Sequence, residues 1–248
     1  MSFPIKYNKF KRFIIGSDAL FWSVCAVVLL ANLLFLNSEY AGPALFKTVS
    51  APPSAPTLVI DAGHGGIDGG AVSSDGTKES DINLAVALRL EYIVRFCGHK
   101  TVMTRWDDSR KTDILSYSER EDLKERVKTV NAIDNAVLIS IHQNYFPTAQ
   151  PSGAQVLYSG ADGSERLGRL IQSNLVSELD ASNRRLAAPA PADLFITANT
   201  HCPAVLVECG FMSNNFEVLK LKDVKYQTSL AIIIACSYMQ FIGEITNV

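Results

Sequence analysis

The sequence predicts an α/β fold: a single domain with a mostly parallel or mixed sheet flanked by helices, preceded by one N-terminal transmembrane helix. Short apolar runs rich in β-branched residues alternate with longer amphipathic stretches, a pattern typical of strands separated by crossover helices. One uncharged apolar segment lies ahead of them and has about the length of a membrane span. The composition, with 48% apolar and 19% charged residues, excludes a disordered chain.

The N-terminal segment is expected to anchor the chain in the cytoplasmic membrane. Residues 1–18 are basic, and residues 19–36 carry no charge and approach the roughly 20 residues that a spanning helix needs. The Lys and Arg residues on the amino side predict a single-pass protein with its N-terminus inside and the rest of the chain outside the cytoplasm. A cleaved signal peptide is the alternative, and the domain would then be secreted, but the apolar region of signal peptides usually has about 7 to 15 residues.

A linker and one folded domain follow the apolar segment. Residues 37–56 are expected to form the linker, because their last part (SAPPSAP) is rich in Pro, Ala and Ser and cannot continue a helix. The domain is expected to comprise residues 57–248. This length is ordinary for one domain, and the segment contains no internal repeat.

The first predicted elements of the domain are a strand, a helix and a second strand. Residues 57–60 are apolar and lead into a glycine cluster, which predicts a buried strand followed by a loop. Residues 80–96 are mainly apolar with spaced charges, so they predict a helix, and Gly98 suits its end. Residues 100–104 predict the next strand.

The remaining elements continue this alternation. Ser118 and Glu121 have the spacing of a capping box and predict the start of a helix. The other predicted elements are strands at residues 136–141, 153–159 and 204–208 and helices at residues 164–179 and 226–242. The first of these strands delivers His142 at its end, and the last strand ends at Glu208.

Charge and motif content exclude several classes of function. A formal net charge of -2 provides no general electrostatic attraction for nucleic acid, so no nucleic-acid partner is expected. The five cysteines include no Cys-x-x-Cys pair, which excludes a zinc ribbon and a thioredoxin motif. A thermolysin-like peptidase is disfavoured because the chain contains no His-Glu-x-x-His.

Titratable residues gather where the predicted strands and loops meet. The candidates are His64 in a glycine-rich loop (DAGHGGIDGG), Glu79 at the head of a helix, His142 after a strand and Glu208 at a strand end. Because the carboxyl ends of parallel strands meet at one edge of a sheet, these groups can converge. Two imidazoles and a carboxylate are a ligand set that zinc accepts, with a fourth position left for water. Each residue alone has an ordinary structural explanation, so the prediction depends on their combination.

Three further polar residues are expected to support this site. Asp61 and Asp68 are expected to form an Asx-type turn or to hydrogen-bond a ligating imidazole. Asn144 is expected to orient His142 or to contact substrate, because it lies two residues from that histidine.

Four motifs resemble those of the zinc-dependent N-acetylmuramoyl-L-alanine amidases of the Amidase_3 type, in the same order and with similar spacing. They are residues 61–66 (DAGHGG), 78–84 (KESDINL), 140–144 (SIHQN) and 203–214 (PAVLVECGFMSN). The resemblance implies that His64, Glu79 and His142 bind one Zn²⁺ ion per chain. It also implies that Glu208 is the catalytic carboxylate.

The resemblance further implies a substrate and a reaction. The substrate would be peptidoglycan, in which the enzyme hydrolyses the amide bond between the lactyl group of N-acetylmuramic acid and L-alanine. Zinc lowers the pKa of bound water toward about 7 and polarises a carbonyl, and Glu208 would act as general base and then as general acid. The short domain, the single N-terminal anchor and the lack of wall-binding repeats also resemble the germination-specific branch of the family. No protein activator is identified.

Two other classes of function remain as alternatives. The first is a catalytically inactive peptidoglycan-binding or regulatory module that retains the same fold. The second is a phosphate-handling enzyme that uses the glycine-rich loop as an anion cradle, although this loop lacks the Gly-Lys-Ser/Thr end of a P-loop. Metal content and digestion of peptidoglycan distinguish the three.

Overall fold

The computed structural model describes residues 54–108 and 118–246. The predicted basic segment, the predicted membrane span and most of the predicted linker lie outside these ranges. Within the ranges, no helix combines the length and the apolar character needed to cross a membrane.

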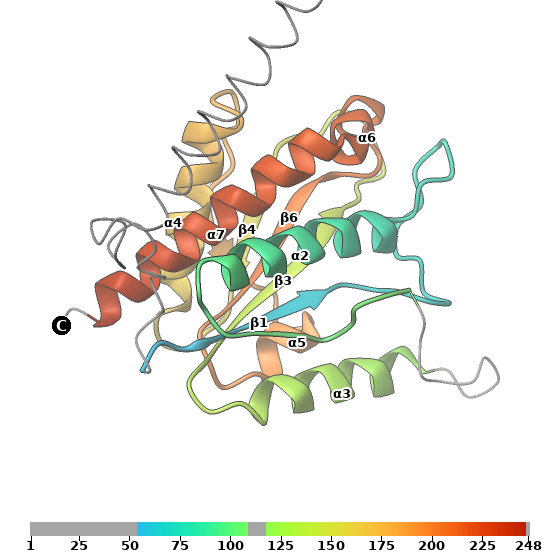
Figure 1. The fold of residues 1–248 in the computed structure, drawn as a ribbon. Coiled ribbons are helices and arrows are strands. Elements are labelled where there is room, and N and C mark those ends of the chain that lie inside the picture. The colour runs from blue at the N-terminus through green and yellow to red at the C-terminus, as the bar shows by residue number, and fades with distance from the viewer. Residues whose placement is uncertain (1–53, 109–117, 247–248) are drawn as a thin grey trace, which may run out of the picture. The chain divides into compact units, whose positions relative to one another are not determined.

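A six-stranded mixed sheet forms the centre of the domain (Figure 1). In spatial order its strands are β2 (Thr101–Met103), β1 (Thr57–Ala62), β3 (Ala136–Asn144), β6 (Ala204–Phe211), β4 (Gln155–Tyr158) and β5 (Ala188–Pro189). The first four are parallel to one another, β4 is antiparallel to β6, and β5 is parallel to β4. The predicted α/β class with a mostly parallel or mixed sheet is therefore confirmed.

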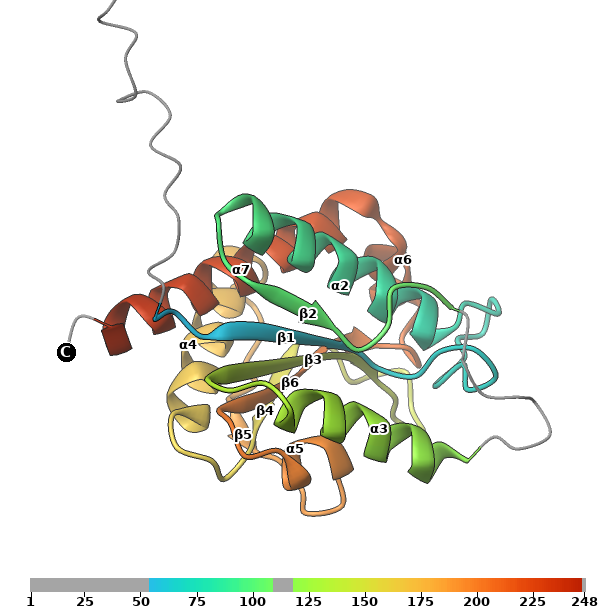
Figure 2. The same cartoon turned by 60° about the horizontal axis from the view of Figure 1, so that its bottom comes forward.

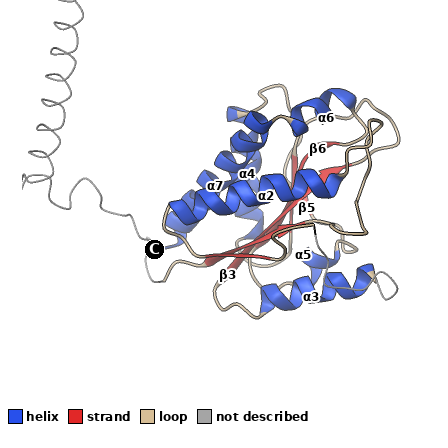
Figure 3. Cartoon of the chain, turned by 45° about the vertical axis from the view of Figure 1, so that its right-hand side comes forward, coloured by secondary structure: helices blue, strands red, loops and turns tan. Residues whose placement is uncertain are grey.

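Helices cover the two faces of the sheet unequally (Figures 2 and 3). One face carries the long helices α2 (Glu79–Phe96), α4 (Ser164–Glu178) and α7 (Val224–Thr246). The other face carries α3 (Glu119–Asn131) and the short α5 (Phe195–Asn199). A further short helix, α6 (Asn215–Lys222), connects β6 to α7.

Side chains alternate between the two faces of the central strands, as strand geometry requires. Leu58 and Ile60 of β1 lie in the large core beneath α2, α4 and α7, whereas Val59 lies in a smaller core with Val130 of α3 and Ile196 of α5. The face beneath α3 and α5 thus contains the smaller core. Because side chains alternate along a strand, Asp61, His142 and Glu208 project from the same face of the sheet as Val59, Leu138 and Ala204.

Three predicted strands ended too early, and three short elements were not predicted. Strands predicted to end at residues 60, 141 and 208 continue to Ala62, Asn144 and Phe211. Polar residues looked like strand ends, but His142 and Glu208 are paired neighbours within the ladder. The missed elements β5, α5 and α6 have too few residues for a periodic pattern. Helix α3 follows Ser118 as predicted, but the Ser118 side chain makes no capping hydrogen bond.

A buried ion pair connects the polar helix α3 to the sheet. Arg126, 7% exposed, donates from Nη1 to Asp61 Oδ1 over 2.8 Å. Asp61 also accepts hydrogen bonds from the hydroxyls of Ser140 and Thr104, each over 2.6 Å. Burial alone would raise the pKa of Asp61, but the charges of Arg126 and His142 and these hydrogen bonds outweigh burial and lower the pKa to about 2. Asp61 is therefore ionised and paired.

Replacing Asp61 should destabilise the domain and change its response to acid. Asp61→Asn is expected to lower the free energy of unfolding by about 3–5 kcal/mol, because Arg126 loses its buried partner. In the parent, the stabilisation due to the depressed pKa is fully present above about pH 4 and is lost as the pH falls through about pH 2. Urea unfolding measured from pH 2 to pH 7 should show that the variant has lost this part of the acid dependence.

Asp81→Asn, on the exposed side of α2, is a suitable control and should leave the free energy of unfolding near the parental value. A parental free energy of unfolding in Asp61→Asn at pH 7 would show that the ion pair contributes nothing.

Candidate metal centre

A cavity of about 310 Å³ lies at the carboxyl edge of the parallel strands, on the α3 and α5 side of the sheet. Its wall includes all four residues that the sequence pattern singled out: His64, Glu79, His142 and Glu208. Asp122 of α3 and Phe195 of α5 line the same cavity. The predicted convergence of distant strand ends at one edge is therefore observed.

Two glycines give the loop after β1 the close packing that the site requires. Gly63 lies against the His142 ring, and a Cβ atom at this position would be 2.1 Å from His142 Nε2. Gly70 has a φ of 66°, and a Cβ atom there would be 2.6 Å from Glu79 Oε2. His64 itself has a φ of 58°, a conformation that costs a non-glycine residue about 1–3 kcal/mol. The loop is therefore shaped to present one imidazole.

Several backbone N–H groups of this loop donate hydrogen bonds to other groups of the protein. The N–H groups of four glycines donate to neighbouring protein oxygens, namely Gly63 to Ile141 O, Gly65 to Asp68 O, Gly66 to Asp108 Oδ1 and Gly70 to Asp68 Oδ1. An anion cradle needs such amides to be free. This arrangement argues against the phosphate-handling alternative.

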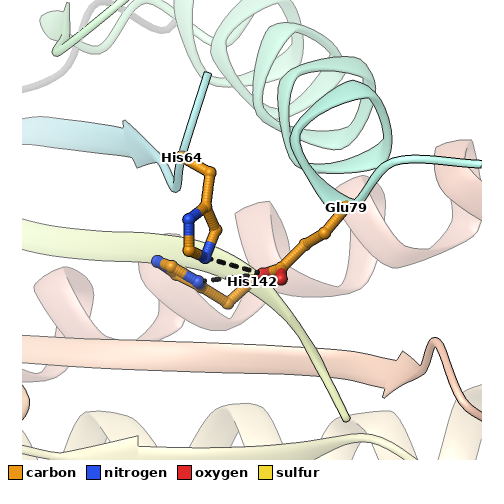
Figure 4. A group of neighbouring side chains, drawn as sticks. All are labelled: His64, Glu79 and His142. Atoms are coloured by element: carbon orange, nitrogen blue, oxygen red, sulfur yellow. Dashed lines mark hydrogen bonds and ion pairs between the residues drawn. The ribbon is translucent and has the colours of Figure 1, made fainter. Parts of the chain in front are cut away.

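His64, Glu79 and His142 lie together at the edge of the sheet (Figure 4). Glu79 Oε1 is 3.4 Å from His64 Nε2 and 3.0 Å from His142 Nδ1, and one donor atom of each residue lies within 4.8 Å of the others. Two ligand atoms that are each about 2.1 Å from a tetrahedral zinc ion are separated by about 3.4 Å. The donor types and spacings of this cluster therefore fit a zinc ion.

Neighbouring groups hold these three side chains in place. His64 Nδ1 and Asp68 Oδ2 are 2.8 Å apart, which directs Nε2 toward Glu79. The Glu79 carboxylate accepts hydrogen bonds from the backbone N–H groups of Ala71 and Gln143, each over 3.0 Å, and from Asn83 Nδ2 over 3.2 Å. These hydrogen bonds fix the orientation of the His64 and Glu79 side chains.

Glu79 is held in its charged form. Burial by itself would raise the pKa of Glu79, but the hydrogen bond and charge of His142, the charge of His64 and the Gln143 amide lower it to about 2. Burial alone would lower the pKa of His142, but Glu79 outweighs burial and raises it. An ionised carboxylate between two imidazoles is an appropriate environment for a divalent cation.

Glu208 faces the same cavity in a different environment. It is the register neighbour of His142 across the β3–β6 ladder, so the two side chains project from adjacent strands. Its Oε2 atom is buried and has no hydrogen-bond partner among the described residues. Burial and, next, the charge of Glu79 raise the pKa of Glu208 to about 7, although His142 and His64 oppose this. The pKa of Glu208 is therefore shifted in the direction opposite to that of Glu79.

The supporting residues differ in part from those expected. Asp68 makes both predicted contacts, the bond to an imidazole and the Asx-type bond to Gly70 N–H. Asp61 lines the cavity, but its carboxylate is occupied by Ser140, Thr104 and Arg126. Asn144 does not line the cavity, and its carbonyl accepts a hydrogen bond from Met212 N–H.

Sequence reasoning missed three residues that support the site. They are Asn83 and Gln143, which bond to Glu79 and to each other, and Arg126, which bonds to the His64 carbonyl. The sequence feature that could have identified them is a polar residue at a buried position of a helix or strand. Burying such a side chain costs free energy unless it forms hydrogen bonds. Only the partners identify its role, and these come from distant parts of the chain.

Comparison with known proteins agrees with this geometry. The sequence pattern of the family described as N-acetylmuramoyl-L-alanine amidase (Amidase_3) matches residues 58–237. The chain belongs to this family. It is an N-acetylmuramoyl-L-alanine amidase that acts on peptidoglycan, as the family assignment and its relatives indicate.

The amidase has relatives that match it over most of their own length. It is 34% identical over 221 residues to the germination-specific N-acetylmuramoyl-L-alanine amidase of Bacillus subtilis, covering 86% of this chain and 91% of that protein. The CwlD amidase of Clostridioides difficile, solved in complex with the GerS lipoprotein, is 34% identical with a TM-score of 0.72, covering 76% of this chain and 99% of that one. An amidase from Clostridium difficile 630 has a TM-score of 0.67 at 29% identity, covering 77% of this chain and 98% of that one.

The close contact at Gly63 yields a prediction about metal binding by the amidase. Gly63→Ala is expected to displace the His142 ring and to weaken zinc binding by about 10- to 100-fold, because the added methyl group would overlap Nε2. Gly160→Ala is the matched control, since a Cβ atom at Gly160 meets nothing within 4 Å. Titration with zinc in the presence of a competing chelator measures the difference, and equal affinities in both variants would contradict it.

Proposed function

We propose that the amidase uses one zinc ion, held by His64, Glu79 and His142, to hydrolyse the bond between the lactyl group of N-acetylmuramic acid and L-alanine. The single observation that carries this proposal is the juxtaposition of Glu208 with the His-Glu-His cluster in one cavity. Bound zinc would supply Lewis acidity toward the scissile carbonyl and toward water.

Glu208 is the residue proposed to move protons. Its carboxylate can accept a proton from the attacking water at Oε2, a buried atom that has no hydrogen-bond partner among the described residues, and burial raises the pKa of this carboxyl above its ordinary value. As the C–N bond breaks, the same oxygen returns the proton to the departing amino group of L-alanine. The products are a lactyl carboxylate on the glycan and a stem peptide with a free amino terminus.

Glu79 and Glu208 are proposed to have different roles because their surroundings differ. Glu79 accepts several hydrogen bonds and stays ionised, which suits a metal ligand. Within the described residues, Glu208 Oε2 accepts no such bond, and burial raises the pKa of Glu208, which suits a general base and acid. This division disfavours an inactive binding module, since such a module needs no carboxylate poised for proton transfer.

Replacing Glu208 tests the proton-transfer role. Glu208→Gln is expected to bind zinc with parental stoichiometry but to lower turnover of muropeptides by at least about 100-fold, because the amide keeps the shape of the side chain and removes the base. Mass spectrometry of the digestion products, combined with metal analysis of the protein, measures both properties.

His64→Ala is the contrasting variant and should lose zinc as well as activity. Digestion by the parent should stop when a chelator removes the metal and resume when zinc is restored. Parental turnover in Glu208→Gln would show that another group moves the proton, whereas chelator-resistant digestion would refute the metal mechanism. Spore cortex peptidoglycan is the first substrate to test, given the likeness to a germination-specific relative.

We also propose that residues 19–36 span the cytoplasmic membrane with the amidase domain outside, as the charge asymmetry of the sequence predicts. Fractionation of cells that express the full chain should place the full-length protein in the membrane, with the domain accessible to protease added outside. Replacing residues 19–36 by a cleavable signal peptide should release the domain. Recovery of a shortened parental protein from the medium would instead show that the segment is a signal peptide.

A further inference from the structure

We propose that Arg126 is a positioning residue that raises the zinc affinity of the amidase by fixing the backbone of His64. This inference rests on the proposed zinc centre and concerns a helix residue outside the ligand set. It assigns to α3 a part in building the metal site, in addition to covering the sheet.

Arg126 connects four groups through one guanidinium. Nη1 donates to Asp61 Oδ1 over 2.8 Å and to the Ala62 carbonyl over 2.7 Å. Nη2 donates to the His64 carbonyl over 2.7 Å, and Nε donates to Asp122 Oδ2 over 2.9 Å. With 7% of its surface exposed, the side chain is removed from water, so these bonds face little competition from solvent.

The hydrogen bond to the His64 carbonyl restrains a residue with an unfavourable backbone conformation. His64 has a φ of 58°, which a residue with a side chain adopts only when its surroundings impose it. Asp68 supports the imidazole from within the same loop. Arg126 instead joins the loop to α3, a separate element that packs against β3 and α5. The loop thereby gains a fixed reference outside itself.

A second arginine supports the neighbouring part of the loop and leaves the His64 carbonyl to Arg126. Arg105 donates from Nε to the Ala62 carbonyl over 2.8 Å and from Nη2 to the Gly63 carbonyl over 3.1 Å. The two guanidiniums thus hold the residues from 62 to 64 between them. The contact at His64 is made to the backbone of a proposed ligand residue itself, so its loss should affect metal binding most directly.

The geometry of these contacts requires arginine in particular. A guanidinium presents several donors in a fixed plane and can serve acceptors on separate segments together. A lysine ammonium at the same position could neutralise Asp61, but it is a single point that cannot also span the Ala62 and His64 carbonyls. Arg126→Lys therefore separates the positioning role from the charge role.

The experiment compares Arg126→Lys with Val130→Ala in the full chain. Val130 is a buried residue of α3, 1% exposed, and has no part in the loop contacts, so its replacement weakens helix packing alone. Zinc affinity is measured by competition with a chromophoric chelator, and the thermal midpoint of the metal-free protein is measured in parallel. Cobalt(II) is then bound at saturation, because its visible spectrum reports ligand geometry.

Arg126→Lys is expected to bind zinc about 10- to 100-fold more weakly and to show an altered cobalt spectrum. Val130→Ala is expected to lower the thermal midpoint while retaining the zinc affinity and cobalt spectrum of the parent. Parental affinity and spectrum in folded Arg126→Lys would overturn the proposal. Equal losses of affinity in both variants would also overturn it, because Arg126 would then act only through stability.

If Arg126→Lys does not fold, a milder variant provides a second test of the proposal. Asp122→Asn removes the charged acceptor of Nε and leaves the other contacts of Arg126 in place, so it is expected to weaken zinc binding at least twofold. Unchanged affinity in that variant would then count against the proposal. Failure of the parent itself to bind zinc would refute the zinc centre, and this outcome is distinguishable from a failure at Arg126.

Discussion

The position of the Glu79 carboxylate is the constraint on which the site depends. One oxygen must face two imidazoles while the group is almost fully buried, and burial disfavours its charge. The protein resolves this conflict with backbone N–H donors from Ala71 and Gln143 and with the Asn83 amide. These donors come from three segments, so the site exists only when the strand edge, the loop and the head of α2 are assembled.

The unequal covering of the sheet explains why a cavity forms there. The face beneath α2, α4 and α7 contains the large apolar core, whereas the opposite face is covered only by α3 and the short α5. Alternation along β1, β3 and β6 directs Asp61, His142 and Glu208 to this more open face. Stability and chemistry are thereby assigned to opposite sides of one sheet. The cost is that α3 requires the buried Arg126–Asp61 pair to hold it.

Neighbouring carboxylates acquire opposite proton affinities through their surroundings. Hydrogen bonds and imidazole charges keep Glu79 ionised, while burial and the charge of Glu79 raise the pKa of Glu208 toward neutrality. The two groups are therefore coupled, because the charge of one contributes to the pKa of the other. A ligand carboxylate and a proton-transfer carboxylate can in this way share one small cavity.

The sequence by itself determined the α/β class, the order of the main elements and the convergence of His64, Glu79, His142 and Glu208. These follow from local patterns, since strand and helix periods and glycine-rich turns are properties of neighbouring residues. The tertiary structure alone decided that β4 is antiparallel, that β6 continues past Glu208 to Phe211 and that Arg126 reaches the His64 carbonyl. It also decided that the Gln143 backbone amide and the Asn83 side chain support Glu79. The contacts of Arg126 and Gln143 join residues more than 60 positions apart, so they depend on how whole elements pack, which no local pattern contains.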